Sequence, residues 1–185
     1  MTDYEKSVLL SLARRAVVAA ASGEQLPDLP EDDICRMPGG AFVTLKTDGR
    51  LRGCIGHFTG TGTLGSTVIA MAREAAVSDP RFIPVSPEEV DDLTIEISVL
   101  SPMERILAED VVPGKHGLYI RQGSRAGTLL PQVALEEGWS REAFLSHTCM
   151  KAGLSPDAYT RSGTEIFAYT AEVFSENKKK EKRLK

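Results

Sequence analysis

Cys54 is the first residue in this sequence whose neighbours suggest chemistry. Residues 51–56 read LRGCIG, so the cysteine stands between two glycines and two positions after Arg52. Alternate side chains of an extended strand share one face, which would place Arg50, Arg52 and Cys54 together. A guanidinium roughly 6–7 Å away along the strand favours the thiolate form of a cysteine. We therefore predict Cys54 as a catalytic nucleophile or thiol ligand, and Arg52 as a residue that stabilises its thiolate or binds an anionic substrate.

The two glycines of this hexapeptide support two interpretations. Gly53 and Gly56 carry no side chain, so they would let a ligand or another backbone approach closely, and both are substrate-binding candidates. Alternatively, a simple two-residue turn before the strand would pair Cys54 with Val43. A small buried cysteine would then be an ordinary core residue, and the glycines would serve tight packing.

Two later segments contribute an acidic candidate and a local ion pair. Glu96 lies in the middle of an alternating apolar segment, opposite its apolar face. If that face lines a cleft, Glu96 would act as a catalytic acid or base or pair with Arg52; otherwise it faces solvent. Asp79 and Arg81 belong to the sequence DPRF, where we interpret them as a cap or a local ion pair.

The histidines are weaker candidates. His147 is predicted at a surface or pocket rim and is a substrate-binding candidate, and as a base for Cys54 it would need the fold to bring the two together. Cys54-x-x-His57 and His147-x-Cys149 resemble halves of a zinc site. At about 100° per helical residue, however, His147 and Cys149 point some 200° apart. No metal site is predicted, no cofactor is indicated, and Cys149 is interpreted as a core residue.

Helices and strands that would position these residues follow from periodicity and turn chemistry. Thr2 and Glu5 match a capping box at the start of the first helix, and Asp48-Gly49 is the favoured hairpin turn. Helices are predicted over 3–22, 64–78, 131–137 and 140–153, with a short helical start at 86–89. Strands are predicted over 41–47, 50–56, 93–100, 117–122, 128–130 and 165–174, and a glycine-rich loop over 57–63. This order predicts an α+β fold with a largely antiparallel sheet flanked by helices.

Composition and charge limit the classes of function. The 185 residues carry a net charge of −4, but residues 178–185 alone carry +5, which leaves −9 for the rest. We expect a domain over 1–175 and a basic, disordered tail over 176–185. An acidic body with few aromatic residues argues against nucleic-acid binding. The absence of a membrane-spanning run, with Asp3 and Glu5 where a signal peptide is basic, predicts a cytoplasmic protein without a membrane partner.

Several segments together resemble one known family. They are AFVTL at 41–45, LRGCIG at 51–56, DPRF at 79–82, EISVLSP at 96–102, LPQV at 130–133 and KAG at 151–153. The sequence is similar over about residues 3–174 to AMMECR-domain proteins, and residues 147–153 resemble their bacterial and archaeal branch, AmmeMemoRadiSam system protein A. The resemblance implies an α+β fold of a larger and a smaller subdomain, closely packed around a cleft near the hexapeptide. It also implies a pathway shared with Memo-like and radical-SAM proteins as partners.

Two functions remain open from the sequence. In the first, the protein acts on or binds a small molecule at the cleft, through Cys54, Arg52 and Glu96. In the second, it is a non-enzymatic binding or scaffold protein that uses the hexapeptide to recognise a partner or peptide.

Overall fold

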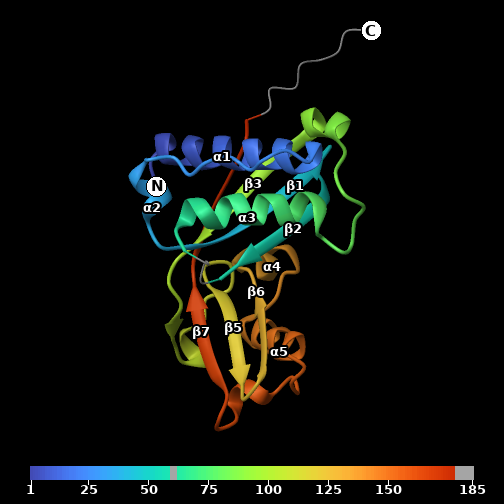
Figure 1. Ribbon diagram of the computed structural model, residues 1–185. Helices are drawn as coiled ribbons and strands as arrows, with labels where there is room; N and C mark the ends of the chain where they lie inside the picture. Colours follow the sequence, from blue (N-terminus) through green and yellow to red (C-terminus); the bar gives the residue numbers. More distant parts are fainter. Residues whose placement is uncertain (59–61, 178–185) are drawn as a thin grey trace. The chain divides into compact units, whose positions relative to one another are not determined.

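The computed structural model describes residues 1–58 and 62–177. Residues 59–61 of the predicted glycine-rich loop, and residues 178–185 of the predicted basic tail, lie outside this range. The chain divides into two compact units (Figure 1), one of Met1–Val99 with the segment from Glu172, the other of Leu100–Ala171. Across the described residues, none of the helices has the length and apolar character needed to cross a membrane.

The first helix, α1 (Asp3–Ser22), begins and ends as its sequence predicts. The Glu5 N–H donates to the Thr2 hydroxyl at 3.2 Å, and the Thr2 N–H donates to the Glu5 carboxylate at 2.6 Å. These two bonds satisfy amides that the first helical turn leaves without partners. Gly23 then ends the helix with a φ of 68°, a left-handed conformation that costs glycine little.

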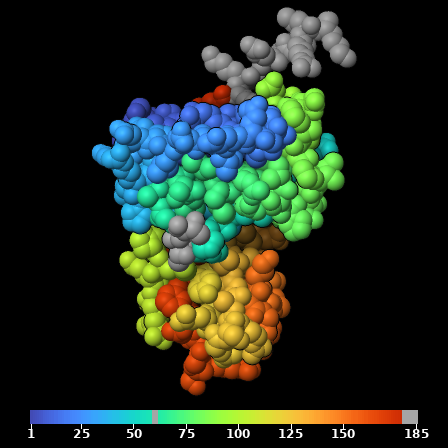
Figure 2. Space-filling view, in the orientation of Figure 1, coloured from blue at the N-terminus to red at the C-terminus, as the bar shows by residue number. Residues whose placement is uncertain are grey.

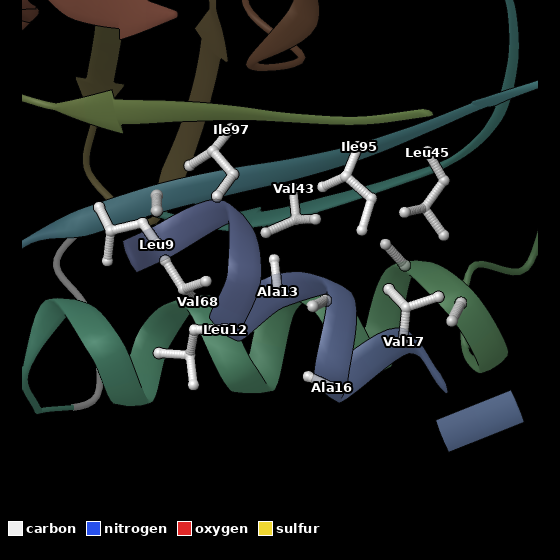
Figure 3. Close-up of a cluster of buried hydrophobic side chains, with 14 of the residues drawn as sticks. Leu9, Leu12, Ala13, Ala16, Val17, Val43, Leu45, Val68, Ile95 and Ile97 are labelled. Atoms are coloured by element: carbon white, nitrogen blue, oxygen red, sulfur yellow. The ribbon is translucent and has the colours of Figure 1, made fainter. Parts of the chain in front are cut away.

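A four-stranded sheet in the order β2-β1-β3-β8 forms the first unit with two long helices. Its strands are β1 (Gly40–Thr47), β2 (Arg50–His57), β3 (Leu93–Leu100) and β8 (Ala171–Ser175). Helix α3 (Leu64–Val77) contacts β1 and β2, and α1 packs beside α3 (Figures 1 and 2). Both helices bury apolar side chains against one face of the sheet (Figure 3), among them Leu9, Leu12, Val17, Val43, Leu45, Val68, Ile95 and Ile97. The opposite face of this sheet is not covered by α1 or α3, and we call it the helix-free face. It carries polar residues of β1 and β3, among them Thr44, Lys46 and Glu96.

Arg14 of α1 connects three segments of the first unit. Its guanidinium donates to the carbonyl oxygens of Val90 and Leu93, each at 2.8 Å, and to the carboxylate of Glu176. Val90 belongs to the 3₁₀ helix η1 (Pro87–Asp92), which precedes β3. Glu176 directly follows β8, so this side chain ties the end of the last strand to the helical layer.

The β1–β2 hairpin has the predicted turn but not the predicted register. Asp48 and Gly49 adopt φ values of 51° and 78°, as the two-residue turn requires. A β-bulge follows, because Leu45 pairs with Gly53 while Lys46 pairs with Leu51. Arg52 is therefore the extra residue. The bulge places Cys54 opposite Thr44, so the predicted pairing of Cys54 with Val43 is wrong.

A second four-stranded sheet, in the order β4-β7-β5-β6, forms the second unit. Its strands are β4 (Glu104–Arg105), β5 (Gly117–Gln122), β6 (Arg125–Leu129) and β7 (Glu165–Tyr169), and β5 pairs antiparallel with both β6 and β7. Helices α4 (Pro131–Glu136) and α5 (Arg141–Lys151) accompany it. The predicted apolar stripe of α5, including Cys149, is buried, and α5 packs against β5 and β6. The α+β fold class is confirmed.

The predicted strand over 165–174 is wrong as a single element. The structure divides it at Thr170 into β7 and β8, which belong to different sheets. At this point the Ser101 N–H donates to the Thr170 carbonyl, and the Thr170 N–H donates to the Ser101 hydroxyl, both at 2.9 Å. The two bonds hold the beginning and the end of the second unit together. Four short elements were not predicted: α2 (Asp33–Arg36), β4, and the 3₁₀ turns Ala108–Asp110 and Ala158–Thr160.

Candidate functional site

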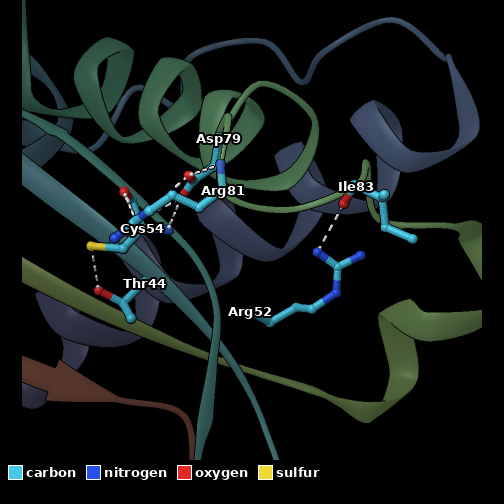
Figure 4. Close-up of polar contacts among 6 residues, drawn as sticks. All are labelled: Thr44, Arg52, Cys54, Asp79, Arg81 and Ile83. Carbon is cyan, nitrogen blue, oxygen red and sulfur yellow. Dashed lines mark hydrogen bonds and ion pairs between the residues drawn. The ribbon is translucent and has the colours of Figure 1, made fainter.

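Cys54 lies on β2, the edge strand of the first sheet, and its backbone is held from outside the sheet (Figure 4). Its N–H donates to the Asp79 carboxylate at 2.9 Å, and its carbonyl accepts from the Arg81 guanidinium at 3.1 Å. Asp79 and Arg81 form an ion pair at 2.7 Å, as the DPRF sequence suggested. Together the two side chains provide the acceptor and the donor that a neighbouring strand would provide. They satisfy backbone groups of Cys54 that an edge strand leaves without partners.

Asp79 is a buried anion in this arrangement. Its side chain is 2% exposed, and its oxygens accept from Cys54 and from the backbone and side chain of Arg81. The guanidinium of Arg81 holds the pKa of Asp79 far below its usual range, with the two backbone N–H groups adding to the effect and burial opposing it. Asp79 therefore stays ionised at neutral pH and positions β2 rather than exchanging protons.

The sulfur of Cys54 accepts a hydrogen bond from the Thr44 hydroxyl at 3.2 Å. Thr44 lies directly across the hairpin, and the two side chains share the face of the sheet that α1 and α3 do not cover. Thr44 was not among the predicted site residues, because its position opposite Cys54 depends on the bulge.

Arg52 points away from this thiol. Its guanidinium forms an ion pair with Glu89 at 3.0 Å and donates to the carbonyl of Ile83 at 3.0 Å. The expectation that Arg52 and Cys54 share one face is wrong, because the bulge at Arg52 interrupts the alternation of β2. A role for Arg52 in binding a substrate remains a prediction.

We expect Arg52→Ala to leave the alkylation rate of Cys54 within about twofold of wild type, because no contact joins the guanidinium to the thiol. The same change should lower the free energy of unfolding by about 1–2 kcal/mol, through the lost bonds to Glu89 and the Ile83 carbonyl. Alkylation followed by peptide mass spectrometry, together with urea unfolding, checks both values. A tenfold loss of Cys54 reactivity in a folded Arg52→Ala variant would restore the original interpretation.

The glycines of the hexapeptide both allow close packing. A Cβ on Gly53 would lie 2.2 Å from the carbonyl oxygen of Ala75 in α3. A Cβ on Gly56 would lie 2.1 Å from the ring of Phe42. The packing interpretation therefore accounts for both residues, and the approach of a ligand to them stays a prediction.

Glu96 lies on the same sheet face as Cys54 and forms an ion pair with Lys46 at 2.8 Å. Lys46 follows Thr44 by two positions on β1, so Thr44, Lys46, Cys54 and Glu96 all project from the helix-free face. The suggested partner of Glu96, Arg52, is replaced by Lys46. This face thus combines a thiol, a hydroxyl and one pair of opposite charges.

His147 and Cys149 lie in the second unit, and Cys35 lies in the core of the first. The His147 ring stacks on Trp139, with parallel planes and ring centroids 3.9 Å apart. Cys35 and Cys149 are fully buried, and burial raises the pKa of each thiol. Residues 1–58 and 62–177 contain no group of three His, Cys, Asp or Glu side chains arranged to hold a metal ion.

Two sheets with helices packed against them define an α+β protein whose candidate site lies on an edge strand. A model of the AMMECR1 family matches residues 10–174. A protein of Methanothermobacter thermautotrophicus is 42% identical over 182 residues, which cover 94% of this chain and 95% of that relative. A protein of Methanosarcina acetivorans is 42% identical over 188 residues, covering 95% and 94% of the two chains. The chain belongs to the AMMECR1 family.

A solved structure has the same fold. The crystal structure of the uncharacterized protein PH0010 from Pyrococcus horikoshii matches with a TM-score of 0.88 and 39% sequence identity. The match covers 96% of this chain and 94% of that one, so both units of the fold are shared.

Proposed function

We propose that this protein binds or acts on a small molecule through the thiol of Cys54, on the helix-free face of the first sheet. The observation that carries the proposal is the set of hydrogen bonds that fixes this residue in place. Its N–H, its carbonyl and its sulfur are held by Asp79, Arg81 and Thr44 respectively. A reactive group needs such fixed geometry, which a merely space-filling cysteine does not.

The surroundings of Cys54 differ from those of the other two thiols. Cys35 and Cys149 lie in the two apolar cores, whereas Cys54 is only partly buried. Thr44 donates a hydrogen bond to its sulfur, and Glu96 with Lys46 supplies acid, base or charge partners on the same face. We propose Cys54 as the nucleophile or thiol ligand and Glu96 as the acid–base candidate.

The wider setting of the proposal comes from the family resemblance. The small molecule would belong to a cytoplasmic pathway shared with Memo-like and radical-SAM proteins, and it would enter a cleft near the hexapeptide. In a second candidate function, this surface recognises a partner protein without chemistry. The tight packing of Gly53 and Gly56 favours neither function, because contacts within the first unit account for both glycines.

Alkylation of the native protein with iodoacetamide tests the proposal, with peptide mass spectrometry reading each cysteine separately. We expect Cys54 to react at least about tenfold faster than Cys35 and Cys149, which serve as buried internal controls. Thr44→Val should slow the reaction of Cys54 several-fold, and Thr44→Ser, which keeps the hydroxyl, should not. Equal protection of all three cysteines until the protein unfolds would reject a functional thiol.

Cys54→Ser and Cys54→Ala separate chemistry from recognition. If the thiolate is the reacting group, both variants fold and both lose turnover of the small molecule. If the surface only recognises a partner, at least one of the two variants retains binding.

A further inference from the structure

A second candidate site lies entirely within the second unit. A surface hollow of about 310 Å³ opens between the segment from Ser101 to Ile106, the residues before β5, and the end of β7. Its polar lining includes Glu104, Lys115 and His116, and Ile106 and Tyr169 supply apolar surface. This volume lies at the small end of the range of about 300–1,000 Å³ typical of ligand pockets. It suits a molecule of few atoms.

Two opposite charges line this hollow without neutralising each other. Glu104 and Lys115 both contribute to its wall, yet neither has an oppositely charged group within 4.0 Å anywhere in residues 1–58 or 62–177. Elsewhere in the same unit, Arg121 and Glu165 form an ion pair at 2.6 Å. The hollow therefore presents an ammonium and a carboxylate that remain available to a bound molecule.

His116 adds a hydrogen-bond donor of defined orientation. The Val112 N–H donates to its Nδ1 at 3.2 Å. Because a backbone N–H can only donate, Nδ1 carries no proton and Nε2 carries the proton of the neutral ring. Burial, with a smaller contribution from Lys115, lowers the pKa of His116, so the ring is neutral at physiological pH. The Nε2–H is then a donor suited to an anionic oxygen.

We propose that this hollow binds a small zwitterion of the amino-acid class. Its carboxylate would be held by the Lys115 ammonium and the Nε2–H of His116, and its amine by the Glu104 carboxylate. The lining of this hollow does not include Cys54, and the proposal does not depend on the function proposed for that residue.

Proton NMR of the full chain tests this proposal, because the sequence has three histidines and their ring signals can be assigned individually. The probes are glycine, β-alanine and γ-aminobutyrate, which place the amine progressively further from the carboxylate. At least one should shift the His116 ring signals saturably and leave those of His57 and His147 in place. Sodium acetate and methylammonium chloride, which each carry one of the two charges, should bind at least about tenfold more weakly, a difference of about 1.4 kcal/mol.

Charge-removing variants complete the test. Lys115→Gln and Glu104→Gln should each weaken binding of the active probe at least about tenfold. Lys151→Gln removes an exposed lysine outside the hollow and should bind as wild type does. Unchanged His147 signals, from the ring stacked on Trp139, would show that the second unit remains folded in each variant. The proposal is overturned if no probe shifts His116 saturably, if acetate alone binds equally well, or if Glu104→Gln binds normally.

Discussion

Replacing Gly53 with alanine is expected to lower the free energy of unfolding by about 3 kcal/mol. The new Cβ would lie 2.2 Å from the Ala75 carbonyl oxygen, a backbone atom within α3. Backbone cannot rotate away as a side chain can, so either β2 or α3 has to move. Movement of either element would disturb the apolar core between them.

Gly56→Ala is the matched control for this change. Its new Cβ would meet the Phe42 ring at 2.1 Å, but the Phe42 side chain can change rotamer and the Ala75 backbone cannot, so Gly56→Ala should cost less than Gly53→Ala. Urea unfolding followed by circular dichroism measures both variants, because the single tryptophan, Trp139, lies in the second unit and reports on that unit. Equal losses in the two variants would mean that the contact with the α3 backbone is not the cause.

Replacing Asp79 with asparagine is expected to lower the free energy of unfolding by about 2–4 kcal/mol. The carboxylate accepts from the Cys54 N–H, the Arg81 N–H and the Arg81 guanidinium, and it is nearly fully buried. Asparagine keeps one acceptor oxygen but presents an NH₂ group to donors that need an acceptor. It also removes the charge that balances Arg81.

Asp157→Asn provides the comparison for Asp79. It breaks the ion pair between Asp157 and Arg161, whose side chains are 62% and 56% exposed, and should cost less than about 1 kcal/mol. Thermal or urea unfolding of both variants gives the contrast. If the Asp79 variant is as stable as the Asp157 variant, then the bonds to the edge strand contribute little.

The Asp79 effect should also depend on pH in one direction. The folded state lowers the pKa of Asp79, so the carboxylate contributes its full stability above the unfolded value of about 3.9. This contribution declines as the pH falls below about 4, because the unfolded chain then gains a proton that the folded chain does not. The difference in stability between wild type and Asp79→Asn should therefore shrink in acid.

Features that depend on residues close in sequence were predictable. The Thr2–Glu5 capping box joins residues three positions apart, and the Asp48-Gly49 turn needs only its two positive φ values. Periodicity likewise identified the buried faces of α1 and α5. In these cases all the groups that form the interaction lie within a few residues of each other in the sequence.

Features that depend on distant packing were not predictable. The bulge at Arg52 depends on how β2 pairs with β1, and it changes which side chains share a face with Cys54. Asp79 meets Cys54 across 25 positions, and Arg52 meets Glu89 across 37. The hexapeptide therefore identified where the candidate site lies, and tertiary packing decided which residues surround the thiol.

Strand β8 completes the first sheet beside β3, although the whole second unit separates the two strands in the chain. During synthesis, α1, β1, β2, α3 and β3 emerge first, while β3 lacks its neighbour and Arg14 lacks Glu176. The bonds between Ser101 and Thr170 form when the second unit folds, and they shorten the loop that must close before β8 can pair. We therefore expect variants that weaken the second unit to slow closure of the first sheet.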